Sequence, residues 1–360
     1  MNATLRKSLR RVNLPLVSIK IPCYNHGKYL GNCLESVLSQ TYPNIEVLIR
    51  DNNSDDDSYE IALSYRKKFK RKGVHYDVSK NKYNIGSDNN TARLTSFAEG
   101  RYQYVMGCDD AISPTFIETC IDLLIHNPEL STVITHREEI DENNQKRISL
   151  PFYNKNCIIP GRKQAAVYMM AGIAVPVQRM FDIRKMTPHI ALYNRKYFVA
   201  GDWATNFLYS LVGDVAYIKE PLCQYRTHFG NETNESELSL MGINEHYSLV
   251  HEFYNIGVNL KIPEIVERRE MAVEKLGSMC MRYTIKMLYI SLHEIAQKYL
   301  TLALVYKPDI VNEDIYKELQ FCLCLKGKKL FARLRKIEDV VSRTISYDPP
   351  EGSTEIIFND

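Results

Sequence analysis

The sequence predicts an α/β protein in which a mostly parallel sheet is covered by helices on both faces and is followed by an all-helical region. From residue 16 onward, short apolar strands alternate with amphipathic helical segments, as in parallel sheets whose strands are joined by helices. From about residue 238 only helical periodicity remains. The 360 residues, 45% hydrophobic and 25% charged, suffice for one large domain with an appended unit.

The strands are predicted from short runs rich in β-branched and aromatic residues. They are expected at residues 16–22, 46–50, 74–78, 102–106 and 132–135. Pro22 should end the hydrogen bonding of the first strand, and the polar loop 51–57 follows the second. Between the strands, apolar residues recur at the spacing of a helix, for example Ile117, Ile121 and Leu124.

Two adjacent carboxylates, Asp109 and Asp110, follow the predicted strand 102–106. Pro114 behind Ser113 predicts the capped start of the next helix, so the pair lies on a loop at the carboxyl end of a strand. Open α/β sheets bind ligands at such ends. A cation such as Mg²⁺ or Mn²⁺, completed by substrate phosphates, would relieve the repulsion within the pair. The alternative is a solvated Asp-Asp turn.

The glycine-rich motifs that commonly bind phosphate are absent from the sequence. No Gly-x-Gly-x-x-Gly follows the first strand, and no Gly-x-x-x-x-Gly-Lys-Ser/Thr occurs anywhere. A nucleotide at this sheet would therefore be held by side chains and a metal. This makes Asp109 and Asp110 more necessary to any nucleotide site.

Charge, cysteine content and hydropathy argue against a nucleic-acid-binding, a secreted or a membrane-spanning protein. The net charge of +3 gives no reason to expect nucleic acid as a partner. Nine cysteines without paired spacing indicate reduced thiols and a cytoplasmic protein. The basic N-terminal segment is not followed by the apolar run of a signal peptide. The longest apolar run, residues 165–177, is interrupted by Gly172 and Pro176 and is too short to cross a bilayer.

A series of short motifs runs through the first two thirds of the chain. The motifs are Val17–Asn25, Leu34–Glu46, Ile49–Asp55, Asn84–Gly86, Ala98–Tyr102, the Asp109–Asp110 loop, Gly201–Trp203 and Glu220–His228. In this order they resemble the inverting family 2 glycosyltransferases, which have the Rossmann-like GT-A fold. The resemblance covers roughly residues 16 to 230 and implies a nucleoside diphosphate sugar as donor.

The resemblance also implies roles for individual residues. Pro22, Tyr24 and Asn25 would line the base and ribose, the loop at Asp51 would recognise the base, and Asp202 would be the catalytic base. Together with the chemistry of the side chains, it gives the nucleotide-binding set Pro22, Tyr24, Asn25, Asp51, Asn52, Asn84, Gly86, Asp109 and Arg226. The expected ligands of Mn²⁺ or Mg²⁺ are Asp109, Asp110 and His228.

Two positions depart from the motifs usual in this family. Asn52 stands where a second acid is common, and its side-chain oxygen is an acceptor able to meet a uracil N–H. Gly107 stands where the metal motif often begins with Asp. One carboxylate fewer predicts weak or substrate-dependent metal binding.

Asp202 precedes the only tryptophan, Trp203, whose ring can shield the carboxylate from water and raise its basicity. A carboxylate there can take the proton of an attacking hydroxyl. The alternative role is the N-cap of a helix predicted over residues 203–211. Arg226 and His228 can clamp a diphosphate, or His228 can add a metal ligand, with a structural role as the alternative.

The segment 161–181 is expected to form the acceptor side of the cleft. Gln178 and Arg179 within it can meet a sugar or phosphate, although a solvated loop is the favoured interpretation. All histidines other than His228, including His26, receive only a structural interpretation.

In the helical region, apolar residues recur at spacings of three and four. They are Val266, Val273, Leu276, Cys280, Tyr283, Met287 and Ile290. The spacing predicts packing within the chain, with a homodimer through these helices as the alternative. Nearer the C-terminus, the basic stretch Lys326–Lys336 accompanies an apolar stripe at Leu330, Leu334, Ile337 and Val341. Such a helix can lie on anionic lipid or present a solvated face.

We therefore predict a basic segment at 1–15, a catalytic domain at 16–235, a helical domain at 236–345 and a tail at 346–360. The predicted reaction transfers a sugar with inversion from a nucleoside diphosphate sugar, foremost a UDP-sugar, to a hydroxyl of a glycan or lipid-linked saccharide at the inner membrane face. A non-catalytic nucleotide-sugar-binding scaffold is one alternative. A sugar nucleotidyltransferase is another, but the turn after the first strand lacks its glycine-rich basic loop.

Overall fold

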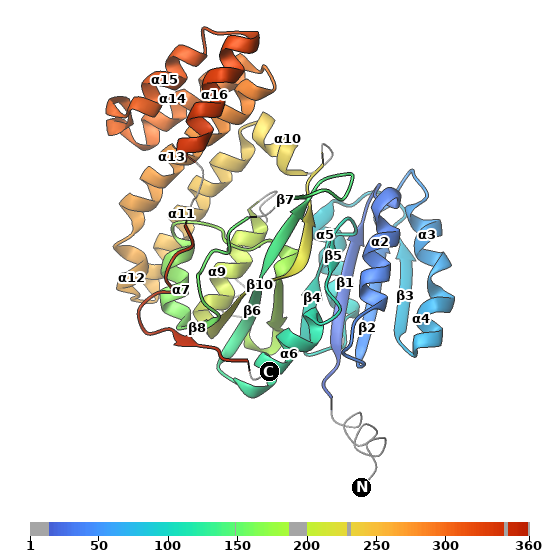
Figure 1. Ribbon diagram of the computed structural model, residues 1–360. Helices are drawn as coiled ribbons and strands as arrows, with labels where there is room; N and C mark the ends of the chain where they lie inside the picture. Colours follow the sequence, from blue (N-terminus) through green and yellow to red (C-terminus); the bar gives the residue numbers. More distant parts are fainter. Residues whose placement is uncertain (1–13, 148, 187–199, 229–231, 342–344, 359–360) are drawn as a thin grey trace.

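The computed structural model describes residues 14–147, 149–186, 200–228, 232–341 and 345–358, and a central sheet organises them (Figure 1). The strands are β1 (Val17–Cys23), β2 (Ile45–Asp51), β3 (His75–Lys80), β4 (Tyr102–Val105), β5 (Ala111–Ile112), β6 (Leu130–Ile140), β7 (Lys146–Arg147), β8 (Cys157–Ile159), β9 (Arg179–Asp182), β10 (Asp214–Arg226) and β11 (Thr354–Glu355). Their order in the sheet is β11-β8-β10-β6-β9-β4-β1-β2-β3, with β5 paired to β10 and β7 to β6.

The half of the sheet formed by β4, β1, β2 and β3 is parallel throughout. Nearly every residue of β1 and β2 is buried, because helices cover both faces, which explains why apolar residues predominate in these strands. The mostly parallel sheet predicted from the sequence is thereby confirmed. β1 continues through Pro22 to Cys23, one residue beyond the expected end.

The helices that cover the sheet are α2 (Gly27–Leu38), α3 (Ser58–Ser64), α4 (Arg66–Lys72), α5 (Ser87–Phe97), α6 (Phe116–His126), α7 (Gly161–Tyr168) and α9 (Gly201–Val212). Helix α6 begins two residues after Pro114, and its N-cap is Thr115. The expected cap at Ser113 is therefore wrong. Ser113 instead donates its backbone N–H to the carbonyl of Leu222, which places the carboxylate loop beside β10.

The other half of the sheet is mixed. β6 and β10 are parallel, while β9 is inserted antiparallel between β4 and β6. β6 extends over residues 130–140, well beyond the predicted 132–135, because its second half pairs with the long β10. This pairing carries the end of β10 to the carboxyl edge of the parallel strands.

A lysine side chain lies in the core beneath this sheet. Lys20 of β1 is 4% exposed, and its Nζ donates hydrogen bonds to Thr95 Oγ1 at 2.9 Å and Gln103 Oε1 at 2.7 Å. Burial lowers the pKa of Lys20 from 10.5 to about 8. The charged form is therefore less favoured in the folded protein than in the unfolded chain.

Lys20→Met is expected to remove a pH dependence of the free energy of unfolding. Between pH 8 and pH 10.5 the unfolded chain binds more protons than the folded protein, so the wild type gains stability as the pH rises. The gain is of the order of 3 kcal/mol. Denaturant unfolding across this pH range measures it, with Lys298→Met on the surface as the control. Equal slopes for wild type and Lys20→Met would contradict the lowered pKa.

The predicted helical C-terminal region is confirmed. It comprises α10 (Glu232–Leu238), α11 (Met241–Asn259), α12 (Pro263–Val266), α13 (Arg269–Tyr289), α14 (His293–Tyr306), α15 (Asp314–Cys322) and α16 (Gly327–Val341). Its apolar core continues into the sheet-bearing part, since Phe207 of α9 stacks on Phe253 of α11 with ring centroids 3.8 Å apart. These helices therefore support the helix that carries Asp202.

The three-four spacing in this region packs helices within the chain. Leu276, Cys280 and Met287 of α13 are buried, whereas Ile290 is 52% exposed. Val266 belongs to the separate helix α12. Burial of the seam inside one chain accounts for the periodicity without a second copy.

The apolar stripe of α16 is also buried. Leu330, Leu334 and Ile337 lie in the helical core, while the side chain of Val341 lies outside the described part of the chain. Of the two interpretations, the packed helix with a solvated basic face describes α16, because its apolar stripe is buried against the helical core. Across the described ranges, no helix combines the length and the hydropathy needed to cross a membrane. All nine cysteines are free thiols.

The segment expected to be a tail is docked on the sheet. β11 pairs antiparallel with β8, matching Thr354 to Ile158, and Tyr347 forms a bridge with Tyr153. Asn154 Nδ2 also donates to Asp348 Oδ1 at 2.8 Å. The prediction of a tail at 346–360 is therefore wrong for residues 346–358, because backbone pairing with an edge strand orders them. At the other end, residues 1–13 of the basic segment lie outside the described residues.

Candidate active site

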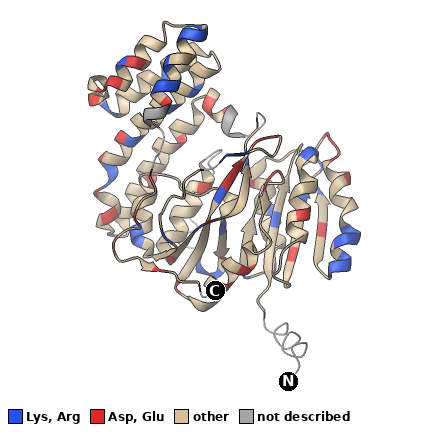
Figure 2. Ribbon diagram, in the orientation of Figure 1, with Lys and Arg blue, Asp and Glu red and all other residues tan. Residues whose placement is uncertain are grey.

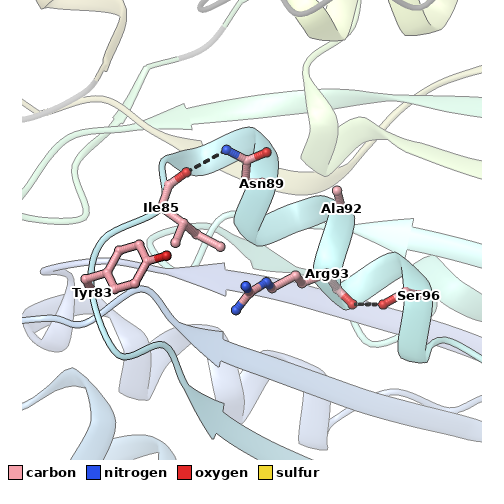
Figure 3. A pocket seen from close by; sticks show the side chains of 6 residues that line it. All are labelled: Tyr83, Ile85, Asn89, Ala92, Arg93 and Ser96. Carbon is pink, nitrogen blue, oxygen red and sulfur yellow. Dashed lines mark hydrogen bonds between the residues drawn. The ribbon is translucent and has the colours of Figure 1, made fainter.

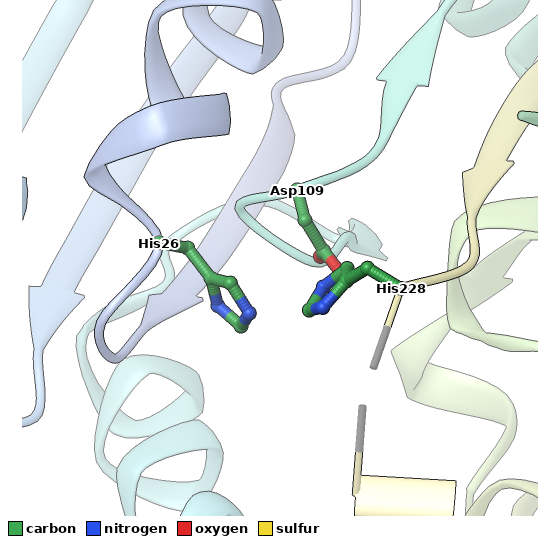
Figure 4. A group of neighbouring side chains, drawn as sticks. All are labelled: His26, Asp109 and His228. Atoms are coloured by element: carbon green, nitrogen blue, oxygen red, sulfur yellow. The ribbon is translucent and has the colours of Figure 1, made fainter. Parts of the chain in front are cut away.

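Loops from three strands meet at the carboxyl edge of the sheet. His26 follows β1, Asp109 follows β4 and His228 follows β10. Their side chains point toward one another across the gap between these loops (Figure 4). One donor atom from each residue can be chosen so that all three lie within 4.8 Å of one another, a spacing suited to a single metal ion. The carboxyl edge is where the sequence predicted the site.

The loops after β1 and β2 fix one another. Asn25 has a left-handed φ of 55°, and its Oδ1 accepts the backbone N–H of Asp55 at 2.9 Å. The backbone N–H of Asn25 donates in return to Ser54 Oγ at 2.9 Å. A Cβ on Gly27 would lie 2.1 Å from Asp57 Oδ1, so a larger residue would require the Asp57 side chain to move. Tyr24, between these contacts, remains 39% exposed.

Asp51 serves mainly the turn of its own loop. The carboxylate is 1% exposed, and it accepts hydrogen bonds from Ser54 N at 2.9 Å and Ser54 Oγ. Lys80 Nζ lies 3.7 Å from Asp51 Oδ2. Base recognition by this loop stays a prediction, and the structure shows Asp51 shaping the loop from within. Pro22 lies in β1 opposite Arg50 of β2.

The side-chain amide of Asn52 is hydrogen-bonded to residues of the loop that follows β3. Its Oδ1 accepts hydrogen bonds from Asn81 Nδ2 at 2.9 Å and from the backbone N–H of Ile85 at 3.0 Å. Its Nδ2 donates to Asn84 Oδ1 at 2.7 Å. An amide oxygen has two lone pairs, and both are occupied here. The expectation that this oxygen accepts a uracil N–H is therefore wrong for this conformation.

The loop before α5 borders a pocket of about 550 Å³. The residues that line it are Tyr83 and Ile85 of this loop and Asn89, Ala92, Arg93 and Ser96 of α5 (Figure 3). Asn84 and Gly86 flank Ile85, and Gly86 has a φ of 82° that favours glycine. The pocket thus adjoins the predicted nucleotide-binding loop, but His26, Asp109 and His228 do not line it.

The two adjacent carboxylates differ in environment. Burial alone would raise the pKa of Asp109, but the hydrogen bond from His228 and the charge of His26 outweigh it and lower that pKa. His228 Nε2 lies 3.2 Å from Asp109 Oδ2. Burial, followed by the charge of Asp109, raises the pKa of Asp110 well above its usual range. The surroundings therefore favour ionisation of Asp109 over ionisation of Asp110.

Asp110 faces the end of β10. It is 5% exposed, and its Oδ1 accepts the backbone N–H of Arg226 at 3.0 Å. Asp110 is not part of the group of donor atoms formed by His26, Asp109 and His228. Both carboxyl groups lean over Gly107, since a Cβ there would lie 2.5 Å from Asp109 Oδ1 and 3.0 Å from Asp110 Oδ2.

Arg226 holds the loop of Asp109. The residue is 1% exposed, with Nε donating to the carbonyl of Asp109 at 2.8 Å and Nη1 to that of Asp141 at 2.7 Å. Its guanidinium also lies 4.6 Å from the ring centroid of Tyr29 on α2. These contacts direct the side chain inward. A diphosphate clamp at Arg226 stays a prediction.

Sequence reasoning missed His26. Its ring lies 5.1 Å from that of His228, and its Nδ1 is 3.5 Å from Cys108 Sγ. Burial lowers its pKa, which favours the neutral imidazole that binds metals. The available signal was its position directly after Asn25, in the turn at the end of a buried strand. The residues that join it are distant in sequence.

Asp202 lies in the first turn of α9, whose N-cap is Ala200. The N-cap alternative is therefore wrong, although Asp202 Oδ1 accepts the backbone N–H of Trp203 at 2.6 Å. Burial raises the pKa of Asp202, opposed by the charge of Arg179. Trp203 is buried, with its Nε1 donating to the carbonyl of Tyr168 at 2.7 Å.

The favoured interpretation of Gln178 and Arg179 as part of a solvated loop is wrong. They are 2% and 6% exposed. Arg179 Nη1 donates to the carbonyl of Asp202 at 2.7 Å and to Asn206 Oδ1 at 2.6 Å. Gln178 Nε2 donates to the carbonyl of Thr135 at 2.7 Å. Both residues tie β9 to its neighbours, and Arg179 fixes the turn that carries Asp202.

Comparison with known proteins agrees with this architecture. Residues 18–200 match the model of a protein family described as glycosyl transferase family 2. The chain belongs to glycosyl transferase family 2. Over 245 residues this family 2 chain is 31% identical to a chondroitin synthase from Escherichia coli, covering 68% of this chain and 33% of that protein. It thus spans about a third of that relative's length.

A second relative of the family 2 chain is an uncharacterized glycosyltransferase from Haemophilus influenzae, 24% identical over 293 residues. The match covers 78% of this chain and 87% of that protein. Among solved structures, S. aureus TarS in complex with UDP-GlcNAc has a TM-score of 0.52 and 14% identity, covering 82% of this chain and 91% of that chain. The predicted family and fold are confirmed. Asn52 and Gly107 still differ from the residues usual at these positions in family 2. In the structure, Asn52 is hydrogen-bonded to Asn81, Asn84 and Ile85, and Gly107 lies beside the carboxyl groups of Asp109 and Asp110.

Proposed function

We propose that this family 2 chain is an inverting glycosyltransferase that moves a sugar from a nucleoside diphosphate sugar, foremost a UDP-sugar, to a hydroxyl of a saccharide. The observation that carries the proposal is the meeting of Asp109, His228 and His26 at the carboxyl edge of a family 2 fold. Support for the donor class comes from TarS, a fold relative crystallised with UDP-GlcNAc and with UDP.

We assign the divalent cation, Mn²⁺ or Mg²⁺, to Asp109 and His228. The donor set fits, because a carboxylate of lowered pKa and an imidazole lie 3.2 Å apart at the strand ends. When bound, the ion neutralises charge that develops on the departing diphosphate. We assign Asp110 to holding the end of β10, because its carboxyl group accepts the backbone N–H of Arg226.

Asp202 is assigned the role of general base. The hydroxyl oxygen of the acceptor forms a bond to the anomeric carbon while the bond to the diphosphate breaks. The hydroxyl proton passes to the carboxylate of Asp202. A single displacement of this kind inverts the configuration. The support is the position of Asp202 at a half-buried helix start whose surroundings raise its pKa.

For the acceptor we propose a saccharide, free or lipid-linked, bound beside α9. Contact of α16 with a membrane would then depend on the charge of this helix, because its apolar stripe is buried. The basic residues Lys328 and Lys329 of that helix are exposed.

The second candidate is a scaffold that binds a nucleotide sugar without transferring the sugar. The occupied oxygen of Asn52 and the absence of a carboxylate at Gly107 favour it. It predicts nucleotide binding that is independent of Asp202 and no turnover of any donor. The nucleotidyltransferase alternative has no comparable support.

A thermal shift experiment tests the proposed site. UDP, GDP, CDP and dTDP are each added with and without Mn²⁺ to wild type, Asp109→Ala and, as a surface control, Asp122→Ala. We expect UDP to stabilise wild type and the control only with Mn²⁺, by about 2.7 kcal/mol at a hundredfold excess over Kd. Asp109→Ala should show no metal-dependent shift. If no nucleotide raises the Tm under any condition, the proposed donor site is wrong.

A further inference from the structure

The position of His26 is fixed by its backbone. Its N–H donates to Ser58 Oγ at 3.1 Å, and its carbonyl accepts the N–H groups of Tyr29 at 2.9 Å and Leu30 at 3.0 Å. The residue is the N-cap of α2, at the end of a buried strand. A side chain anchored in this way enters the cluster from the side opposite β10 (Figure 4).

The imidazole ring of His26 is also oriented. Its Nδ1 lies 3.5 Å from Cys108 Sγ, the residue next to Asp109. Its ring meets that of His228 edge-on, with centroids 5.1 Å apart and an interplanar angle of 73°. Histidines that bind metals commonly have one nitrogen held by a neighbour while the other faces the ion. The contact with Cys108 Sγ can fix Nδ1 of His26 in this way, so that Nε2 is the nitrogen that faces Asp109 and His228.

In the described part of the site, the carboxylate loop contributes one oxygen donor residue to this cluster. A side chain on Gly107 would come within 2.5 Å of Asp109 Oδ1, so a carboxylate there would displace Asp109 from its contact with His228. Asp110 is engaged with the backbone of Arg226. Among the His, Cys, Asp and Glu side chains that the structure describes, the donors that converge here are one carboxylate and two imidazoles.

We propose that His26 is a third ligand of the cation and that the two imidazoles make the site selective for Mn²⁺, Co²⁺ or Zn²⁺ over Mg²⁺. Imidazole nitrogen suits transition metals, whereas Mg²⁺ prefers carboxylate, carbonyl and water oxygen. The inference rests on the proposed function, because it concerns the ion expected beside the diphosphate. It goes beyond that function by naming a ligand outside the Asp109–Asp110 loop and the metal class that the ligand favours.

Two variants of His26 separate the roles of its nitrogens. In His26→Asn the amide stands near the place of Nδ1, so the contact with Cys108 can remain while the donor at Nε2 is lost. In His26→Gln the amide oxygen reaches the place of Nε2 and replaces nitrogen by oxygen. His126→Asn, on the exposed face of α6, is the matched control.

Calorimetric titration of the metal-free protein with Co²⁺, Mn²⁺ and Mg²⁺, each alone and with UDP, measures the effect. Visible absorption of bound Co²⁺ reports its ligands without any turnover. We expect His26→Asn to weaken Co²⁺ binding about 10- to 100-fold, a range that even the outer partners of metal ligands carry. Mg²⁺ affinity should change little, His26→Gln should shift the preference toward Mg²⁺, and His126→Asn should match wild type.

Other results would overturn the inference. Wild-type Co²⁺ affinity in His26→Asn, together with loss of binding in Asp109→Ala, would show an ion held without His26 and would leave the proposed function intact. Unchanged Co²⁺ affinity with weakened UDP binding would make His26 a phosphate contact. If wild type binds none of the three ions with or without UDP, no metal site exists. The nucleotide thermal shifts then decide the proposed function separately. The Tm of each variant shows whether it is folded.

Discussion

Asp202→Asn is expected to lower kcat by about 10²–10⁴ while leaving UDP affinity unchanged, because it removes the acceptor of the hydroxyl proton but keeps the shape of the side chain. Turnover of a UDP-sugar with a saccharide acceptor measures the first effect, and calorimetry with UDP the second. Asp122→Asn, which removes an exposed carboxylate on α6, is the control. Wild-type turnover by Asp202→Asn would show that Asp202 is not the general base, whereas absence of turnover in the wild type itself would favour the scaffold.

Because the pKa of Asp202 is raised, Asp202→Asn should also change the pH profile of kcat/KM and the stability of the protein. The acidic limb of the pH profile of kcat/KM should lie above the ordinary range of an aspartate in the wild type and should vanish in Asp202→Asn. Because the folded-state pKa lies above the unfolded value, ionisation of this carboxyl group lowers stability as the pH rises through that window. Asp202→Asn should therefore be at least as stable as wild type at neutral pH. A clear loss of stability would instead indicate a structural role for the carboxylate at the start of α9.

Arg226→Met is expected to lower the free energy of unfolding and to abolish metal-dependent binding of UDP. The variant leaves the partly buried carbonyls of Asp109 and Asp141 without their guanidinium donor. The cost of about 1–3 kcal/mol for each fully buried unsatisfied group sets an upper bound of about 6 kcal/mol on the loss. Denaturant unfolding measures it, and the nucleotide thermal shift reports the loop of Asp109.

Arg333→Met provides the matched control for this loss, since its guanidinium pairs with Glu318 on the surface of the helical region. An exposed pair of this kind contributes at most about 1 kcal/mol. If Arg226→Met unfolds like wild type but no longer binds UDP, Arg226 contacts the diphosphate directly. That outcome would support the role of Arg226 as a diphosphate clamp, predicted from the sequence, over its role in holding the loop of Asp109.

The parts of the site that the sequence predicted are those with a local cause. A buried strand followed by polar residues places Asp109 and the loop at Asp51 at a carboxyl edge, whatever happens elsewhere in the chain. His26 lies in an equally local turn. Its partners, however, come from β4 and β10, and no local pattern shows that a histidine at position 228 approaches it.

The predictions that failed concern pairings between distant segments. The oxygen of Asn52 was expected to be available, but Asn81 and Ile85, about thirty residues along the chain, occupy it. Arg179 resembles a solvated residue in its own segment and becomes buried only when α9 packs beside β9. Local composition indicates which groups a segment carries, whereas the partners of those groups depend on the whole topology.

The docking of β11 on β8 has a consequence for how the molecule is made. The edge of the sheet receives this strand only after the helical region has been synthesised, because β11 follows α16 in the chain. Until residues up to 355 leave the ribosome, the backbone of β8 lacks its outer partner, and unpaired strand edges are sites of association between chains. The sheet is therefore completed only after the helical region has been translated. A chain whose translation stalls within these helices would leave the edge of β8 unpaired and accessible to chaperones.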